Sequence, residues 1–289
     1  MAPPVLGVDI GGTAIKIGRV TTDGTLRDAR QLPTPHEPEA VADLIAGEAA
    51  ATPTAAIGVV SPGIVDEQRG VVVYSANLGW RELALRDLLS TRLGAPVVTG
   101  HDVRAGALAE SRWGAGEPDL FFLPLGTGLA SALITDGQIR GTGWAGEIGQ
   151  ILVPDPDGGG RVPLERVCAA GALAHRYAAA TGSSDTSGGA RAVFQRAAAG
   201  DEAARRVLDS AIEALADVLA TSAGLLGPVP VVLGGGLAEA GDALVQPLRA
   251  ALAARLPEPA MPPLRRAGLG QWAGCLGAAA LAMTSGGSP

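Results

Sequence analysis

The chain of 289 residues is long enough for one large or two medium domains, and its 47% hydrophobic content argues against intrinsic disorder. A formal net charge of −7 argues against a nucleic-acid-binding surface, which needs clustered lysine and arginine. Cys168 and Cys275 are the two cysteines, too few for a disulfide framework or a four-cysteine zinc site.

The N-terminus and the apolar runs predict a cytoplasmic protein. Residues 1–5 contain no basic segment that leads into an apolar one, so we expect no signal peptide. No run reaches the roughly 18 apolar residues that span a bilayer. We therefore expect neither a membrane nor a nucleic acid as a partner.

The first predicted elements are two strands joined by a glycine-rich turn. An apolar strand ends at Asp9, the turn is Gly11-Gly12-Thr13, and a second strand follows. This is not a Walker A loop, which precedes a helix. Exposed N–H groups and the Thr13 hydroxyl can still bind a phosphate, and Asp9 can hold Mg²⁺ through water. The alternative is an ordinary hairpin turn, which a lone Gly-Gly-Thr favours.

Helices and strands alternate over the next stretch of the chain. We expect a helix over residues 39–51, a strand over 55–60 that ends in a turn containing Gly63, a strand over 71–74 and a helix over 83–93. Such alternation is typical of an α/β domain.

The strand-to-helix junction at Asp102 is the feature on which the functional prediction depends. Residues 96–98 predict a short buried strand, Gly100 predicts a turn, and residues 103–113 predict an alanine-rich helix. Asp102 therefore lies near a helix N-terminus, where it presents a carboxylate to a cleft. The alternative is that Asp102 only caps the helix, a role worth about 1 kcal/mol that the cap preference of Asp favours.

The strand–turn–strand pattern of the N-terminus recurs later in the chain. A strand over residues 120–125 leads through Gly126-Thr127-Gly128 into a strand over 129–134. The recurrence predicts two halves of related architecture, whose glycine–threonine turns can hold a polyphosphate from both sides.

Helices and one further glycine-rich segment complete the chain. We expect helices over residues 190–226, 244–256 and 271–283. A strand over 229–233 enters Gly234-Gly235-Gly236 directly, which predicts a close backbone approach. The adenosine of a nucleotide is the candidate ligand there.

In their order and spacing these segments resemble the ROK family of sugar kinases and repressors, within the actin-like, hexokinase-like ATPases. The resemblance covers residues 6–283. It implies an α/β fold of two ribonuclease-H-like domains with a cleft between them, formed by residues 1–115 plus 271–289 and by residues 116–270. The matching segments are Asp9-Ile10-Gly11-Gly12-Thr13, Ser61-Pro62-Gly63-Ile64-Val65-Asp66, Asn77-Leu78-Gly79-Trp80, the Asp102 junction, Leu125-Gly126-Thr127-Gly128, Ala145-Gly146-Glu147-Ile148-Gly149 and Gly234-Gly235-Gly236.

The resemblance implies an ATP- and Mg²⁺-dependent kinase for the 6-hydroxyl of glucose, or of a glucose-like amino sugar such as kanosamine. Asp102 is the implied general base. The implied sugar-binding residues are Gly63, His101, Asp102, Glu147, Gln150 and Glu165. The implied nucleotide-binding residues are Asp9, Gly11, Gly12, Thr13, Lys16, Thr127, Gly128, Gly234 and Gly235.

The sequence departs from the family pattern at the sugar site and at a metal loop. His101 replaces the usual Asn before the base, and Gln150 replaces a usual His. Pro156, Gly158 and Pro163 stand where the family often has zinc-binding cysteines. Since zinc needs thiolate or imidazole ligands, we expect no structural zinc. The first two changes favour a sugar modified at C3, with glucose still a candidate.

Two other functions compete with the kinase. A non-catalytic, sugar-sensing regulator is the main alternative. The family's repressors carry an N-terminal helix-turn-helix domain, whereas here the phosphate turn begins near residue 9, which favours the kinase. A phosphotransferase that uses polyphosphate is the other alternative, although the net charge gives no sign of a basic groove. Family members are often dimers, and the sequence is compatible with a homodimer.

Overall fold

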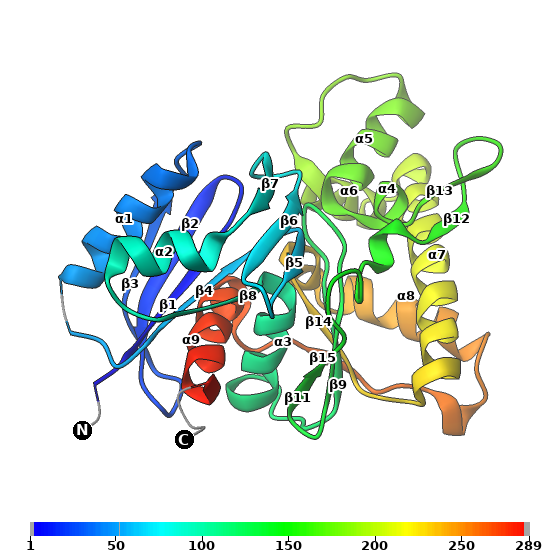
Figure 1. Cartoon of the computed structure of the whole chain (residues 1–289). Helices are drawn as coiled ribbons and strands as arrows, with labels where there is room; N and C mark the ends of the chain where they lie inside the picture. Colours follow the sequence, from blue (N-terminus) through cyan, green and yellow to red (C-terminus); the bar gives the residue numbers. More distant parts are fainter. Residues whose placement is uncertain (1–2, 52, 286–289) are drawn as a thin grey trace. The chain divides into compact units, whose positions relative to one another are not determined.

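The computed structural model describes residues 3–51 and 53–285 (Figure 1). These residues divide into two units, each with its own sheet and helices. The first takes the described residues of Met1–Asp119, Ala132–Ala145 and Gly268–Pro289; the second comprises Leu120–Ser131 and Gly146–Ala267. The predicted α/β class is confirmed. Within the described residues, no helix combines the length and the apolar character needed to cross a membrane.

A five-stranded mixed sheet forms the centre of the first unit. Its order is β3 (Leu26–Pro33), β2 (Ala14–Val20), β1 (Val5–Ile10), β4 (Ile57–Ser61) and β8 (Val97–His101). The first three strands are antiparallel, whereas β1, β4 and β8 are parallel. A smaller antiparallel sheet contains β5 (Ile64–Asp66), β6 (Val71–Ser75) and β7 (Trp80–Leu83), and β10 (Ala132–Thr135) pairs with β11 (Gln138–Arg140).

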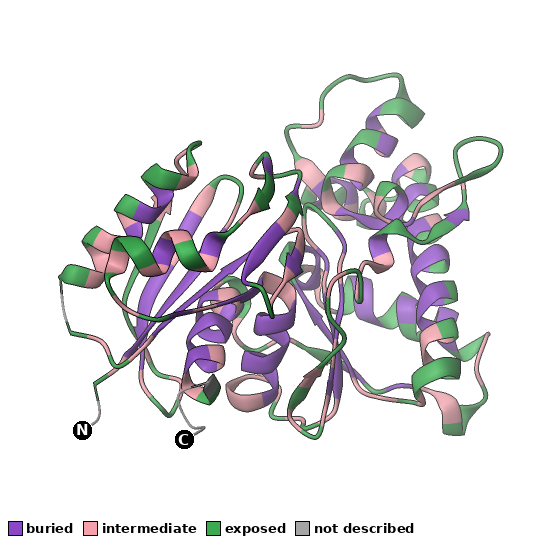
Figure 2. Ribbon diagram, viewed as in Figure 1, coloured by how far each residue is buried: buried purple, intermediate pink, exposed green. Residues whose placement is uncertain are grey.

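Helices cover both faces of this sheet, so β1 and β4 are buried along their length (Figure 2). Helices α1 (Pro38–Ala50) and α2 (Leu85–Leu93) share a core with Leu6, Val8 and Ile10 of β1. Helix α9 (Ala273–Ser285) packs on the opposite face, and α3 (Asp102–Trp113) packs against α9 (Figure 1). Helix α9 approaches β4 so closely that a Cβ atom at Gly58 would lie 1.9 Å from the Ala278 carbonyl oxygen.

Side-chain alternation along β1 decides where Asp9 lies. Successive residues of a strand point to opposite faces of the sheet. Leu6 and Val8 face α1 and α2, so Asp9 faces α9 at the carboxyl end of the strand. The packing agrees, because a Cβ atom at Gly274 would lie 2.6 Å from Asp9 Oδ2.

The second unit has a parallel sheet in the order β9 (Leu120–Pro124), β14 (Val231–Gly234) and β15 (Leu264–Arg266). A short antiparallel hairpin joins β12 (Leu152–Pro154) to β13 (Arg161–Pro163). The helices of this unit are α4 (Glu165–Cys168), α5 (Ala170–Thr181), α6 (Gly189–Ala198), α7 (Glu202–Leu226) and α8 (Asp242–Ala253). The Asp201 side chain caps α7 by accepting from the Ala204 N–H.

Most of the predicted long elements are present, but the helical stretch over 190–226 is two helices, α6 and α7. Strand β3 and helix α5 were not predicted, and Gly100, where a turn was expected, lies within β8. The predicted helix over 271–283 begins as a helical turn at Gly270–Trp272 and continues as α9, which packs on the N-terminal sheet as expected. Strands β12, β13 and β15 have three residues each, too few to show a periodic pattern. Residues 132–145 group with the first unit, whereas the predicted second domain includes them. The predicted domain division and the cleft stay predictions.

Candidate functional site

The turn between β1 and β2 presents two of the predicted phosphate-binding residues to solvent. The Gly11 N–H donates to the Ala14 carbonyl oxygen at 3.0 Å and closes the turn. Thr34 stabilises the turn through two hydrogen bonds. The Thr34 hydroxyl donates to the Gly11 carbonyl at 2.6 Å, and the Thr34 N–H donates to the Thr13 carbonyl at 3.1 Å. Gly12 and Thr13 are exposed. Their N–H groups and the Thr13 hydroxyl are donors of the kind that bind phosphate.

Asp9 and Lys16 form an ion pair beside this turn. The two residues are direct partners in the β1–β2 ladder, and Lys16 Nζ lies 3.5 Å from Asp9 Oδ2. Burial, and next the negative charge of Asp102, raise the pKa of Asp9 to about 6, while Lys16 opposes the rise. A carboxylate of this kind is a hard oxygen donor and fits Mg²⁺, either directly or through water.

Asp102 is the first residue of α3, and its carboxylate is only 28% exposed. Oδ1 accepts a hydrogen bond from the Val103 N–H at 2.7 Å. Burial raises the pKa of Asp102; the Val103 N–H and the positive charges of Arg104 and Lys16 oppose that rise. A carboxylate with a raised pKa is a better proton acceptor than an ordinary one.

His101, rather than Asp102, caps helix α3. Its Nδ1 accepts from the Arg104 N–H at 3.4 Å, and the residue is 4% exposed. His101 is therefore buried and does not point into solvent. Burial, followed by the charge of Arg104, lowers the pKa of His101 to about 3. The imidazole is therefore neutral near pH 7, and it lies 3.4 Å from Asp102 Oδ1.

Arg104 is a buried cation that the sequence analysis did not single out. Its side chain is 2% exposed, and Nε and Nη2 lie 2.7 and 2.6 Å from Glu67 Oε1. Nη1 donates to the carbonyl oxygens of Gly143 and Ala145 at 3.3 and 3.2 Å. The available signal was an arginine two residues after the candidate base, at the start of an alanine-rich helix. Arg104 ties the start of α3 to two loops of its unit.

Gly63 lies in the turn after β4, close to the end of β8. Its φ of 108° is unfavourable for other residues, and a Cβ atom would lie 2.2 Å from the Tyr74 carbonyl oxygen. Ser61 and His101 are neighbours in the parallel pairing of β4 with β8. Asp9, Gly63 and Asp102 therefore lie at the carboxyl ends of three parallel strands, the edge at which α/β sheets usually bind ligands.

In the second unit, the two predicted nucleotide-binding segments lie side by side. The Leu125 N–H donates to the Gly234 carbonyl at 2.9 Å, and the Leu237 N–H donates to the Leu125 carbonyl at 3.0 Å. Gly235 has a φ of 72°, and a Cβ atom there would lie 2.5 Å from the Leu125 carbonyl oxygen. The structure thus brings Gly234 and Gly235 next to the turn that contains Thr127 and Gly128.

Two of the predicted sugar-binding residues of this unit form a pair. The Gln150 amide Nε2 donates to Glu165 Oε1 at 2.7 Å, and the Gln150 N–H donates to the Glu147 carbonyl at 3.0 Å. Thr127 and Glu165 both line a cavity of about 830 Å³. Glu165 therefore lies on the same cavity wall as a residue of the predicted phosphate turn.

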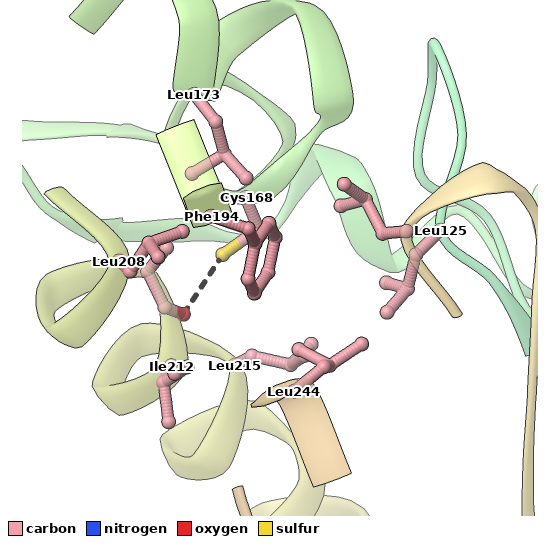
Figure 3. Close-up of a pocket in the computed structure, with 10 residues that line it drawn as sticks. Leu125, Cys168, Leu173, Phe194, Leu208, Ile212, Leu215 and Leu244 are labelled. Atoms are coloured by element: carbon pink, nitrogen blue, oxygen red, sulfur yellow. Dashed lines mark hydrogen bonds between the residues drawn. The ribbon is translucent and has the colours of Figure 1, made fainter. Parts of the chain in front are cut away.

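Cys168 lies in an apolar pocket beneath this region (Figure 3). Its thiol donates to the Ala211 carbonyl oxygen at 3.2 Å, and burial raises the pKa of Cys168 to about 12. Cys168 is therefore a buried, free cysteine that lies outside the predicted metal loop. The pocket is lined mainly by Leu125, Leu173, Phe194, Leu208, Ile212, Leu215 and Leu244.

The residues of the predicted metal loop do not fit zinc. Gln150, Pro156, Gly158 and Pro163 supply neither thiolate nor imidazole. Over residues 3–51 and 53–285, no group of three or more His, Cys, Asp or Glu side chains is arranged to hold a metal. That the protein carries no structural zinc stays a prediction.

The chain is similar to sugar kinases over most of its length. It is 32% identical over 278 residues to a glucokinase of Streptomyces coelicolor, covering 84% of this chain and 85% of that protein. It is 32% identical over 259 residues to an N-acetylmannosamine kinase of Shigella flexneri, with coverage of 84% and 87%.

A solved structure and a family profile agree with these relatives. The crystal structure of a ROK family glucokinase from Streptomyces griseus, in complex with glucose and AMPPNP, matches with a TM-score of 0.81 at 29% identity, covering 97% of this chain and 99% of that one. Residues 5–285 match the profile described as the ROK family. The protein belongs to the ROK family.

Proposed function

We propose that the protein is an ATP-dependent hexose kinase that phosphorylates the 6-hydroxyl of its sugar, with Asp102 as the general base. The observation that carries this proposal is the partly exposed Asp102 carboxylate, whose pKa is raised by burial, at the start of α3. The relatives named above are sugar kinases, and one was solved with glucose and an ATP analogue.

Asp102 accepts the proton of the sugar hydroxyl as that oxygen attacks the γ-phosphorus of ATP. The γ-phosphoryl group moves to the sugar, ADP leaves, and the proton remains on Asp102 until solvent removes it. Phosphoryl transfer needs mainly positioning, charge stabilisation and one group to orient the nucleophile. Burial makes the carboxylate more basic, whereas the Val103 N–H and the positive charges of Arg104 and Lys16 oppose this rise in pKa.

In this proposal the nucleotide contacts come from glycine-rich turns in both units. Gly11, Gly12, Thr13 and Lys16 bind phosphates, as do Thr127 and Gly128, and Gly234 and Gly235 contact adenosine. Asp9 would hold Mg²⁺, which neutralises charge on the transferred phosphoryl group when bound. The exposure of Gly12 and Thr13, and the hydrogen bond between Leu125 and Gly234, support these assignments.

The proposed sugar site comprises Gly63, His101, Asp102, Glu147, Gln150 and Glu165. Carboxylates suit hydroxyl recognition because each oxygen accepts more than one hydrogen bond. The buried, neutral His101 replaces a smaller amide in the family pattern, which favours a C3-modified sugar such as kanosamine over glucose.

A panel of sugars with ATP and Mg²⁺ tests this function. Glucose, mannose, N-acetylglucosamine, N-acetylmannosamine and 3-aminoglucose are compared by kcat/KM from ADP release, and NMR of the product locates the phosphate. We expect sugar-dependent ADP release, with phosphate on C6 and the highest kcat/KM for the 3-amino sugar. A kcat/KM for glucose equal to or higher than that for 3-aminoglucose would contradict the proposed preference for a C3-modified sugar.

Two further results of the same panel distinguish the alternative functions. Sugar binding in calorimetry without turnover of any sugar would contradict the kinase and support a sugar-sensing regulator. Faster reaction with polyphosphate than with ATP would contradict ATP as the donor.

A further inference from the structure

Arg176 is a buried guanidinium within α5 that the proposed reaction does not use. Its side chain is 8% exposed. Nε and Nη2 donate to the two carboxylate oxygens of Asp157, at 2.5 and 3.1 Å. Nη1 donates to the carbonyls of Val167 and Val207 at 3.0 and 3.4 Å, and Nη2 also donates to the Ser210 hydroxyl at 2.7 Å. One side chain thus bonds to the β12–β13 loop, to α4 and to α7.

The loop that Asp157 occupies cannot be held by hydrophobic packing. Residues 155–160 connect β12 to β13, and none of the six is buried. Within the loop, Asp155 accepts from the Asp157 N–H at 3.0 Å and donates its own N–H to the Gly160 carbonyl at 3.1 Å. These bonds shape the loop but do not attach it to a helix. The two-point ion pair to Arg176 does attach it.

The same hairpin carries two residues of the proposed sugar site at its base. Gln150 precedes β12, and Glu165 follows β13 after one intervening residue. The Leu164 N–H donates to the Ile151 carbonyl at 2.8 Å and closes the base of the hairpin, next to the 2.7 Å bond between Gln150 and Glu165. A displacement of the hairpin would therefore move both side chains.

This loop is also where the family resemblance places a metal, and its residues do not fit one. Pro156, Gly158 and Pro163 offer no metal-binding side chain, and Gln150 offers only an amide. A planar guanidinium that binds a carboxylate through two parallel hydrogen bonds supplies both strength and fixed geometry. It can therefore serve as a cross-link of the kind that a metal would otherwise provide.

We infer that the Arg176–Asp157 ion pair is the metal-free cross-link of the β12–β13 hairpin, and that it acts as a positioning device for Gln150 and Glu165. The second part rests on the proposed function. The pair joins residues 19 apart and anchors the loop to helix α5, so its loss should free the loop. The core should stay closed, because none of residues 155–160 is buried.

The substitution Asp157→Ala tests both parts. It leaves Arg176 with its acceptors at Val167, Val207 and Ser210, so the buried guanidinium stays hydrogen-bonded. We expect amide hydrogen exchange over residues 155–163 to accelerate by about tenfold, since local opening no longer breaks a charge-assisted pair. We expect the KM for the sugar to rise by roughly three- to tenfold, with kcat and the KM for ATP within about twofold.

Control variants separate this effect from a general loss of charge. Glu202→Ala removes an exposed ion pair with Arg206 in the same unit and should leave exchange over 155–163 and all kinetic constants unchanged. Asp157→Glu keeps the charge and should restore part of the protection. EDTA should leave exchange in the wild type unchanged; acceleration by EDTA would mean that a metal holds the loop.

Each outcome decides one part of the inference. Unchanged exchange over 155–163 in Asp157→Ala would overturn the cross-link. Faster exchange with an unchanged sugar KM would overturn the positioning role. If the wild type turns over no sugar, the proposed function and the positioning role both fail, whereas the exchange measurement still decides the cross-link.

Discussion

The two units supply their candidate functional residues by different means. In the first unit, charged side chains at the ends of β1 and β8 lie in buried surroundings that raise the pKa of Asp9 and Asp102. In the second unit, the candidates include backbone glycines and the surface pair of Gln150 with Glu165. Under the proposed function, the general base lies in the first unit, whereas Gln150 and Glu165 of the second unit only bind the sugar. Substitutions in the first should change rate and pH dependence, and those in the second should change apparent affinity.

The largest effect is expected for Asp102→Asn. The amide has nearly the same shape but cannot accept the sugar proton, so kcat should fall by about 10² to 10⁴. Sugar affinity measured by calorimetry should stay within about threefold, because one oxygen acceptor remains. Asp87→Asn, on the exposed side of α2, is the matched control and should change neither quantity. Full activity of Asp102→Asn would show that another group is the base.

Asp9→Asn should raise the free energy of unfolding above about pH 6 and lower the activity. Since the folded state raises the pKa of Asp9 from 3.8 to about 6, the stability contribution of this group is complete below about pH 4 and is lost as the pH rises through about 6. The variant should therefore be more stable than the wild type by about 2–3 kcal/mol near pH 8, with no gain near pH 4. Urea unfolding at the two pH values measures this difference.

Kinetics and a pH series complete the Asp9 test. Activity should fall in the same variant, because an amide holds Mg²⁺ less well than a carboxylate does. A stability difference that does not depend on pH would contradict the assignment of a buried, titrating carboxylate at the end of β1.

The smallest effect is expected for Gln150→Ala, in the second unit. The lost hydrogen bond to Glu165 is worth about 1 kcal/mol, so the KM for the sugar should rise by about fivefold while kcat stays within about twofold. Gln138→Ala, on the exposed hairpin of the first unit, is the control and should have no effect. A fall in kcat larger than the change in KM would remove the distinction between the two units.

The sequence was informative where local spacing determines structure. Strand–turn–strand segments around Gly11 and Thr127 follow from apolar runs interrupted by glycine, and the junction at Asp102 follows from a strand that meets an alanine-rich helix. The parallel pairing of β4 with β8 then brings the Gly63 turn near the end of β8.

Long-range polar contacts could not be predicted in the same way. Arg104 and Glu67 are 37 residues apart, and Arg176 and Asp157 are 19 apart, so only the folded chain shows them as partners. The capping role of His101 was also missed, because Asp is the commoner cap and stands next to it. Each missed contact involves a charged or polar side chain that tertiary structure buries.

Helix α9 has a consequence for the order in which the chain can fold during synthesis. It covers one face of the N-terminal sheet, where the missing side chain of Gly58 lets its backbone approach β4. Residues 273–285 must therefore be synthesised before the N-terminal strands can bury Val5 and Val20 against α9. The second unit becomes complete slightly earlier, once β15 at residues 264–266 has been made. The amino-terminal strands are made first but complete their core last.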